Sequence, residues 1–187
     1  MAAEKRADVE ARTIRAERIE LVDGEGKVRA VLGVDADGPI LALADAAGKP
    51  RAVLDLVADG RRLNLQHAAG KPRAFLRVDA DGPVLALADA AAKTRAVLGV
   101  DAEGPVLTLL NAAGEARASL SLAADRPALR LADAAGETRA SLALAGNTPA
   151  LSLADTTGKT RAFLGVAADT AGLALLNPAG ETIWRAP

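Results

Sequence analysis

The sequence contains no cysteine, no tyrosine and a single histidine, and its only aromatic residues are Phe75, Phe163 and Trp184. Without cysteine, the chain can form neither a disulfide bond nor a thiolate metal site. Without a set of aromatic side chains, it offers almost nothing on which a nucleobase or a sugar ring could stack. These absences argue against a stacking surface for nucleic acid and against the cysteine-based metal centres.

The charges of the chain nearly cancel, with 23 basic and 24 acidic residues and a net charge of -1. Such a balance gives no electrostatic attraction to nucleic acid or to anionic lipid. The first twenty residues are charged throughout, unlike a secretory signal peptide, and no apolar run approaches the length of a transmembrane helix. We therefore expect no nucleic-acid partner and no membrane insertion. Cytoplasm is the default localisation, with an extracellular or virion-type fibre as the alternative.

A 22-residue period organises almost the whole chain. From residue 18 to residue 187 the sequence divides into seven full copies and a truncated eighth, with no insertion or deletion. The copies begin at Arg18, Ile40, Arg62, Val84, Val106, Ala128, Ala150 and Gly172. A period of this length is typical of linear repeat architectures. We therefore expect one elongated array over residues 18–187, preceded by residues 1–17 as a polar N-terminal cap or short helix.

Each copy predicts two β-strands. Positions two and four of the copy are leucine throughout, apart from Ile19, and position fifteen is leucine in all seven full copies. Position seventeen is always valine or leucine. Apolar residues two apart follow the period of a strand, and each run is too short for a buried helix. The predicted fold class is therefore all-β, built from tandem 22-residue β-hairpin repeats.

The sequence also predicts the turns between these strands. Positions six to nine read Asp-x-x-Gly, as in residues 45–48, which is typical of a type I turn closed by a glycine in the left-handed region. Positions eighteen to twenty-one repeat this pattern in residues 35–38. In later copies Arg126, Thr148 and Thr170 replace the glycine of the second turn. Two turns in each copy complete the hairpin repeat.

Two arrangements of the strands fit this pattern, an antiparallel meander and a parallel β-solenoid. In a solenoid the arginine at position twelve of every full copy would stack about 4.8 Å from the next, which is unfavourable for like charges. In a meander, position six lies across the hairpin from position ten, and this places Asp45 opposite Lys49 and Asp89 opposite Lys93. The meander is therefore favoured, with the β-solenoid as the alternative.

The expected register puts apolar residues on both faces of the sheet. One face would carry the leucines of positions two and four with Val31, Val53, Phe75 and Val97 of position fourteen. The other face would carry positions fifteen and seventeen. A lone sheet of some sixteen strands buries neither face, so we expect it to close, to fold over or to pair with copies of itself, and self-association is the natural solution. A homotrimeric prism is the first choice and an open filament the other, with Trp184 and Ile183 as candidate self-association residues.

The residues that could carry chemistry do not form a recognisable site. His67 stands in a turn where other copies have aspartate, and neither a second histidine nor a cysteine could complete a metal site or a nucleophilic relay. The Asp-x-Asp-Gly turns offer carboxylates to calcium, but the same residues are ordinary turn formers. We expect no enzymatic activity, no metal and no cofactor. The sequence favours a structural repeat protein, with a module that presents a repetitive binding surface as the alternative.

Overall fold

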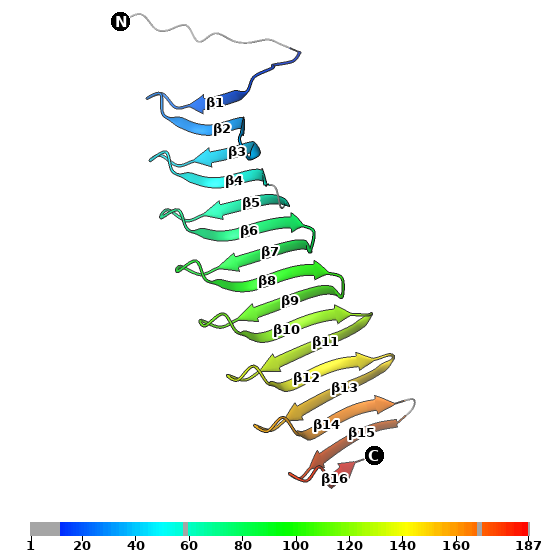
Figure 1. Ribbon diagram of the computed structural model, residues 1–187. Coiled ribbons are helices and arrows are strands. Elements are labelled where there is room, and N and C mark those ends of the chain that lie inside the picture. The colour runs from blue at the N-terminus through cyan, green and yellow to red at the C-terminus, as the bar shows by residue number, and fades with distance from the viewer. Residues whose placement is uncertain (1–11, 58–59, 168–169, 187) are drawn as a thin grey trace, which may run out of the picture.

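The computed structural model describes residues 12–57, 60–167 and 170–186, and they form one antiparallel β-sheet (Figure 1). Its sixteen strands are β1 (Arg18–Val22), β2 (Val28–Asp35), β3 (Gly38–Ala44), β4 (Pro50–Val57), β5 (Gly60–Gln66), β6 (Pro72–Asp79), β7 (Gly82–Ala88), β8 (Thr94–Asp101), β9 (Gly104–Leu110), β10 (Ala116–Ala123), β11 (Arg126–Ala132), β12 (Thr138–Ala145), β13 (Thr148–Ala154), β14 (Thr160–Ala167), β15 (Thr170–Leu176) and β16 (Thr182–Ala186). Two strands fall in each copy, as the leucine spacing predicted.

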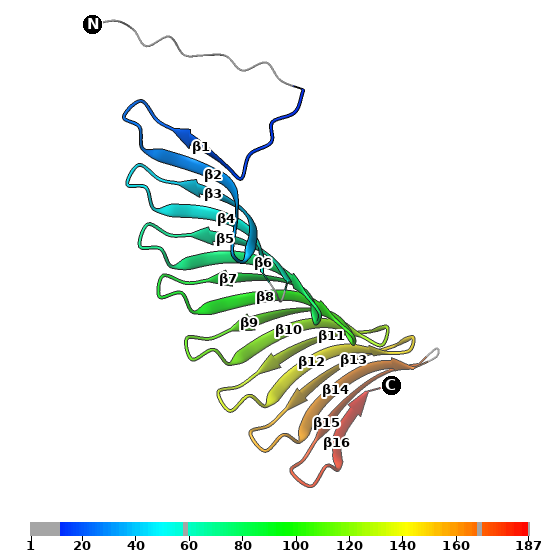
Figure 2. The ribbon, with the colours of Figure 1, turned by 45° about the horizontal axis from the view of Figure 1, so that its top comes forward.

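The strands follow one another in chain order, each hydrogen-bonded to the next in antiparallel orientation. This confirms the meander and excludes the solenoid. The sheet stays open, with β1 at one end and β16 at the other (Figure 2). Residues 12–17 contain neither helix nor strand, and the rest of the expected N-terminal cap lies outside the described residues.

The first turn of the copy has the predicted geometry. In the turn that follows β3, the Gly48 N–H donates to the Asp45 carbonyl at 2.9 Å, and the Asp45 N–H donates to the Lys49 carbonyl at 2.9 Å. The Asp45 carboxylate accepts the N–H groups of Ala47 and Lys49 at 2.9 and 3.0 Å. Gly48 has a φ of +76°, a conformation that glycine adopts without a steric cost. The turn is a type I turn closed by a left-handed glycine.

A β-bulge follows this turn and makes the expected register wrong. Ala44 pairs with Pro50, but the next residue along, Leu43, pairs with Ala52, so Arg51 has no partner on the opposite strand. The same shift recurs in the other hairpins of this type. Because side chains alternate between the faces of a strand, one extra residue moves everything beyond it to the opposite face.

As a result, positions two, four, fifteen and seventeen all share one side of the sheet, which we call the Leu face. Its central row pairs position two with position fifteen along the whole array. The members of this row are Ile19, Leu32, Leu41, Leu54, Leu63, Leu76, Leu85, Leu98, Leu107, Leu120, Leu129, Leu142, Leu151, Leu164 and Leu173. Val31, Val53, Phe75 and Val97 lie on the opposite face, contrary to expectation.

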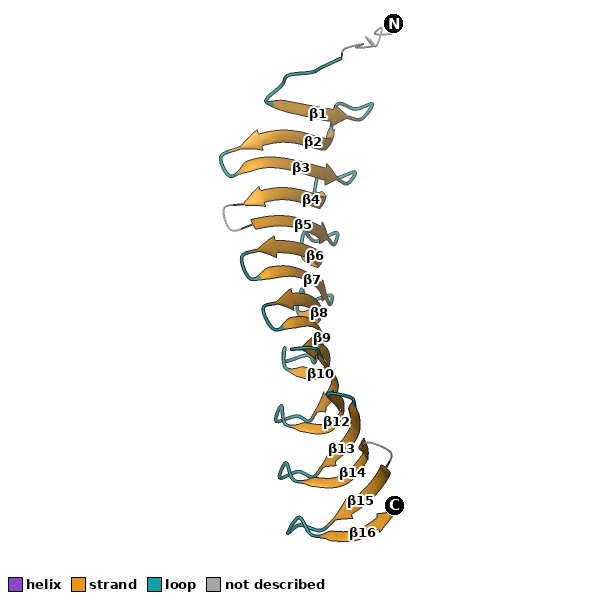
Figure 3. Ribbon diagram, turned by 90° about the vertical axis from the view of Figure 1, so that its right-hand side faces the viewer, coloured by secondary structure: helices purple, strands orange, loops and turns teal. Residues whose placement is uncertain are grey.

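The sheet is one layer thick, and within the described residues no second layer covers either face (Figure 3). The buried apolar residues are three alanines, Ala30, Ala86 and Ala128. From Ile19 to Leu164, every side chain of the central row remains 36–53% exposed. A single chain therefore has the strands of a β-protein without its hydrophobic core.

The second turn changes its form along the array. At Gly82 and Gly104 a Cβ atom would lie 2.0 and 2.1 Å from the carbonyl oxygens of Val100 and Leu122, so glycine is required by the close approach of the following hairpin. Where arginine replaces this glycine, at residue 126, the two preceding residues adopt positive φ angles of 48° and 61°. This resembles a type I′ turn, which joins two strands without a glycine at that position.

Candidate self-association surface

The Leu face is apolar across three rows of side chains. Beside the central row, one row alternates leucine with alanine, as in Leu43 and Ala52, and the other pairs position seventeen with position twenty-two, as in Val34 and Pro39. Among the residues of these rows, Arg61 is the one that carries a charge. Contiguous apolar surfaces of this size on folded proteins are commonly interaction sites, which makes the Leu face the candidate surface of this chain.

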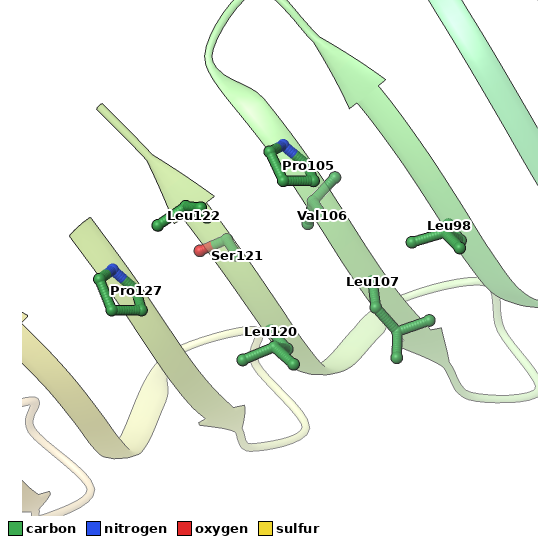
Figure 4. Close-up of a pocket in the computed structure, with 8 residues that line it drawn as sticks. All are labelled: Leu98, Pro105, Val106, Leu107, Leu120, Ser121, Leu122 and Pro127. Atoms are coloured by element: carbon green, nitrogen blue, oxygen red, sulfur yellow. The ribbon is translucent and has the colours of Figure 1, made fainter. Parts of the chain in front are cut away.

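The surface of the Leu face has shallow depressions between its leucine side chains. One shallow depression lies between Leu98, Leu107 and Leu120, with Leu122 and Pro127 completing its apolar wall (Figure 4). An adjoining depression is lined by Leu120, Leu129, Leu142, Leu144 and Pro149. Ridges of leucine alternating with such hollows provide the relief into which side chains of another apolar sheet can insert.

The opposite face is mixed, and in its N-terminal half it carries Val31, Val53, Phe75 and Val97 beside polar pairs. Asp55 and Arg62 pair across β4 and β5, with 2.6 Å between the carboxylate and the guanidinium. Further along, the Arg130 guanidinium donates to the hydroxyl of Ser121 at 3.2 Å. Hydroxyls, glycines and alanines occupy most of the same rows in the C-terminal half. The Leu face is therefore the more continuously apolar of the two, and a sheet whose faces differ in this way is suited to burial on the more apolar side.

A repeated contact, which we call the arginine clasp, joins most hairpins of the array to the next one. The bulged arginine of position twelve donates to the aspartate of position six in its own hairpin; the Arg139 Nε, for example, lies 2.6 Å from Asp133 Oδ2. The same guanidinium also donates to the carbonyl groups of Asp155 and Thr156 in the following hairpin, at 3.1 Å in the case of Thr156. The clasp therefore connects the arginine with carbonyl groups of the next hairpin that lie sixteen or seventeen residues further along the chain.

Four other copies bind the aspartate in the same way. The pairs are Arg29–Asp23, Arg51–Asp45, Arg95–Asp89 and Arg161–Asp155. The sequence had placed lysine of position ten opposite this aspartate. The main chain of the lysine does pair with the aspartate, as at Lys49 and Asp45. The ion pair of Asp45 forms with Arg51 instead, because the bulge turns the arginine side chain toward the turn.

Three copies lack the aspartate, two with asparagine and one with histidine in its place. In the fifth copy Asn111 replaces the aspartate. The Glu115 carboxylate there accepts hydrogen bonds from the Asn111 side-chain amide at 2.8 Å and from the Arg117 guanidinium at 2.6 Å. In the third copy His67 replaces it without such compensation. The Nε of Arg73 in this copy is buried and has no hydrogen-bond partner. The coupled change of positions six and ten was visible in the sequence, and the contact explains it.

The turn holds the clasp carboxylates in their ionised form. The backbone N–H groups of Lys27, Lys49 and Lys93 are the largest influence lowering the pKa of Asp23, Asp45 and Asp89 below its usual value. In Asp133 the guanidinium of Arg139 has the largest effect on the pKa, again downward. In Asp155 the hydroxyl of Thr157 lowers the pKa most strongly. Hydrogen bonds to a carboxylate favour its charged form.

The two residues predicted for self-association lie on the final strand, β16. Trp184 pairs with Leu175 and continues a row of the Leu face, in the place where every full copy has alanine. Ile183 stands where every full copy has the clasp arginine. Their exposed fractions are 49% and 65%. Both are thus available at the end of the sheet.

Within the described residues, the fold does not bring His67 or the turn carboxylates together into a metal or catalytic site. His67 is exposed in its turn, where its Nδ1 accepts the Ala69 N–H at 3.3 Å. Across the part of the chain that the structure describes, no three carboxylates or histidines gather as metal ligands would. Nor does any described segment form a helix long and apolar enough to cross a membrane.

No protein-family model matches this sequence, and a search of curated proteins finds no relative.

Proposed function

We propose that the chain is a non-catalytic structural protein, a building block of an elongated rod or scaffold in which copies cover one another's Leu faces. The observation that carries this proposal is the unbroken central row of the Leu face, half exposed along nearly its whole length. Among the described residues, no group of histidine, aspartate and glutamate side chains could hold a metal ion. A surface that repeats without interruption suits assembly better than recognition of a single small ligand.

The free energy available at this surface is large enough for stable association. Burying a leucine that is already half covered contributes roughly 1 kcal/mol. Over the central row alone this sums to on the order of 10 kcal/mol, and the two flanking rows add to it. Association costs about 4–15 kcal/mol in lost freedom of motion, so the Leu face supplies what is needed when it is covered along its length.

A further copy of the same chain is the partner that fits the Leu face best. It presents an apolar surface of the same length, with strands at the same spacing of about 4.8 Å and with matching hollows. A closed oligomer places identical surfaces against one another, which a self-complementary leucine surface allows. A homotrimeric prism, with three Leu faces toward a common axis, is the arrangement we favour.

The test compares lysine substitutions on the two faces of the same strands. Leu107 pairs with Leu120 on the Leu face, and Thr108 pairs with Ser119 on the opposite face. We expect the L107K/L120K variant to dissociate, because two charges would be buried at the interface. The T108K/S119K variant adds the same charges to the water-exposed face and should keep its mass.

The measurement is the solution mass by light scattering behind a sizing column. A wild-type mass of three chains would support the prism, and dissociation confined to L107K/L120K would support the Leu face as the interface. A wild-type protein that stays monomeric would contradict the proposal and favour a module that binds another protein. Equal masses for both variants would show that the interface lies elsewhere.

A further inference from the structure

We propose that the sheet also grows end to end, with β16 of one copy pairing antiparallel with β1 of the next, so that the meander continues across the junction. This proposal rests on the self-association proposed above and adds a second contact to it. The Leu face joins copies side by side, whereas the strand edges join them along the length of the rod.

Both ends of the sheet present strand edges that can accept another strand. β1 is hydrogen-bonded to β2 alone and β16 to β15 alone, so within the described residues their outer edges are unpaired. Neither strand contains the proline or lysine that commonly blocks an edge. Ile183 of β16 is the unpaired residue of the bulge in the pairing with β15. The two edges lie at opposite ends of the array, which leaves each open to a different neighbour (Figure 1).

The register of this junction follows from the register of the array. Within the chain, position fifteen of one copy always pairs with position two of the next, as Leu164 does with Leu173. Ala186 is position fifteen of the last copy, and Ile19 is position two of the first. Continuing the pattern therefore places Ala186 opposite Ile19, Arg185 opposite Glu20 and Trp184 opposite Leu21.

This register brings two opposite charges together. Inside the chain, Glu20 pairs with Val31 and Arg185 with Ala174, so neither faces an opposite charge across its strand pair. Glu20 contacts Arg18 on its own strand, at 2.6 Å. Across the junction, Glu20 and Arg185 would lie directly opposite each other. Opposite charges in this position stabilise a strand pair, and like charges destabilise it.

The same register brings apolar residues together beside this charge pair. Trp184 would lie against Leu21, which is 62% exposed, and Ile183 would come next to Val22, which is 54% exposed. Ile183 and Trp184 depart from the repeat: isoleucine replaces the clasp arginine of the full copies, and tryptophan replaces their alanine. The ends therefore complement each other in charge and in hydrophobicity.

A contact between two different edges does not close on itself, so repeated junctions give a filament. We accordingly expect the wild-type mass to increase with concentration beyond that of the closed oligomer. The R185E variant would place glutamate opposite Glu20, and the E20R variant would place arginine opposite Arg185. For each variant alone, the concentration at which the mass begins to rise should increase about tenfold.

Mixing the two variants provides the decisive control. In the mixture, Arg185 of the E20R chain meets Glu20 of the R185E chain, and the reversed pair meets at the next junction. Growth should therefore return on mixing and in the E20R/R185E double variant, which a folding defect in either single variant would not permit. R130E changes an arginine at position three within the array, on the same face, and should leave growth unaltered.

The result distinguishes this junction from the Leu-face contact. A wild-type mass that stays constant with concentration at a fixed number of chains would overturn the junction and retain the proposed function. Growth of R185E and E20R at wild-type concentrations would likewise overturn it. An L107K/L120K variant that keeps the closed oligomer, while R185E and E20R lose growth along the rod, would instead overturn the Leu-face contact alone.

Discussion

At the scale of single residues, the arginine clasp carries the most specific polar contact in the molecule. In the clasp of Arg139 the guanidinium binds the turn carboxylate of its own hairpin and a carbonyl group of the next, so it acts both within and between copies. Where His67 replaces the aspartate, the Nε of Arg73 has no hydrogen-bond partner. In the copy of Asp155 the carboxylate contact is formed and the nitrogen without a partner is Nη1 of Arg161.

Restoring the missing aspartate should stabilise the protein. We expect H67D to raise the free energy of unfolding by about 0.5–1 kcal/mol, because the carboxylate would bind both the Arg73 guanidinium and the N–H groups of its turn. Urea unfolding followed by circular dichroism provides the measurement. The H67A variant, which offers no carboxylate, serves as the control. A gain of the same size in both would show that the clasp does not contribute.

The lowered pKa values of the clasp carboxylates predict how stability depends on pH. A carboxyl group whose pKa is lowered by folding stabilises the protein fully above its unfolded pKa, which is near 3.8 for aspartate. This contribution is lost as the pH falls through the folded value. The urea midpoint should therefore be level down to about pH 5 and decrease below about pH 4. The D89N variant should decrease less steeply, and an identical slope would contradict this assignment.

At the scale of the hairpin, the first turn depends on a left-handed residue at position nine. Seven copies supply glycine there, with φ between +76° and +87°, and the fourth copy supplies Ala92 with φ of +65°. A residue with a Cβ atom is strained in this region, since its side chain approaches its own backbone. The hairpin formed by β7 and β8 therefore stores strain that the others do not.

Replacing Ala92 with glycine should relieve this strain. We expect A92G to raise the free energy of unfolding by about 1 kcal/mol, and G114A, the reverse change in the next copy, to lower it by about the same amount. Thermal and urea unfolding of the two variants and the wild type would be compared. Nothing lies within 4 Å of a Cβ atom at Gly114, so a loss there would reflect the backbone and not a clash. Destabilisation by A92G would refute the argument.

At the scale of the whole molecule, the sheet has long-range order without a core. Sixteen strands pair in sequence, yet the buried apolar side chains among the described residues are alanines. An isolated array of this kind is held mainly by its main-chain hydrogen bonds, its turns and its clasps. Its stability should therefore depend on what covers the Leu face.

We accordingly expect the stability of the protein to depend on its concentration. When folding is coupled to association, a tenfold increase in concentration adds about 1.4 kcal/mol per mole of dimer or about 2.8 kcal/mol per mole of trimer. Urea midpoints measured over a hundredfold range of concentration would show this increase. The L107K/L120K variant should lose the dependence and keep a low midpoint. A constant midpoint in the wild type would mean that the single sheet is stable by itself.

Much of this structure followed from the sequence, because it depends on residues close together in the chain. The 22-residue period, the paired strands, the aspartate and glycine of the first turn and the order of the meander were all predicted from local patterns. Trp184 and Ile183 were singled out because they break the repeat, and both lie at the exposed end of the sheet.

The tertiary structure decided which side chains share a face. Residues 41 and 54 are both leucines at strand positions, and their spacing alone allows them to lie on the same face or on opposite faces. The single unpaired residue at Arg51 places them together, because one residue of register exchanges the two faces of every strand beyond it. That same residue brings arginine, and not lysine, to the turn aspartate. The sequence thus determined the repeat, and the bulge determined that the leucines of positions two and fifteen share one face instead of being divided between two.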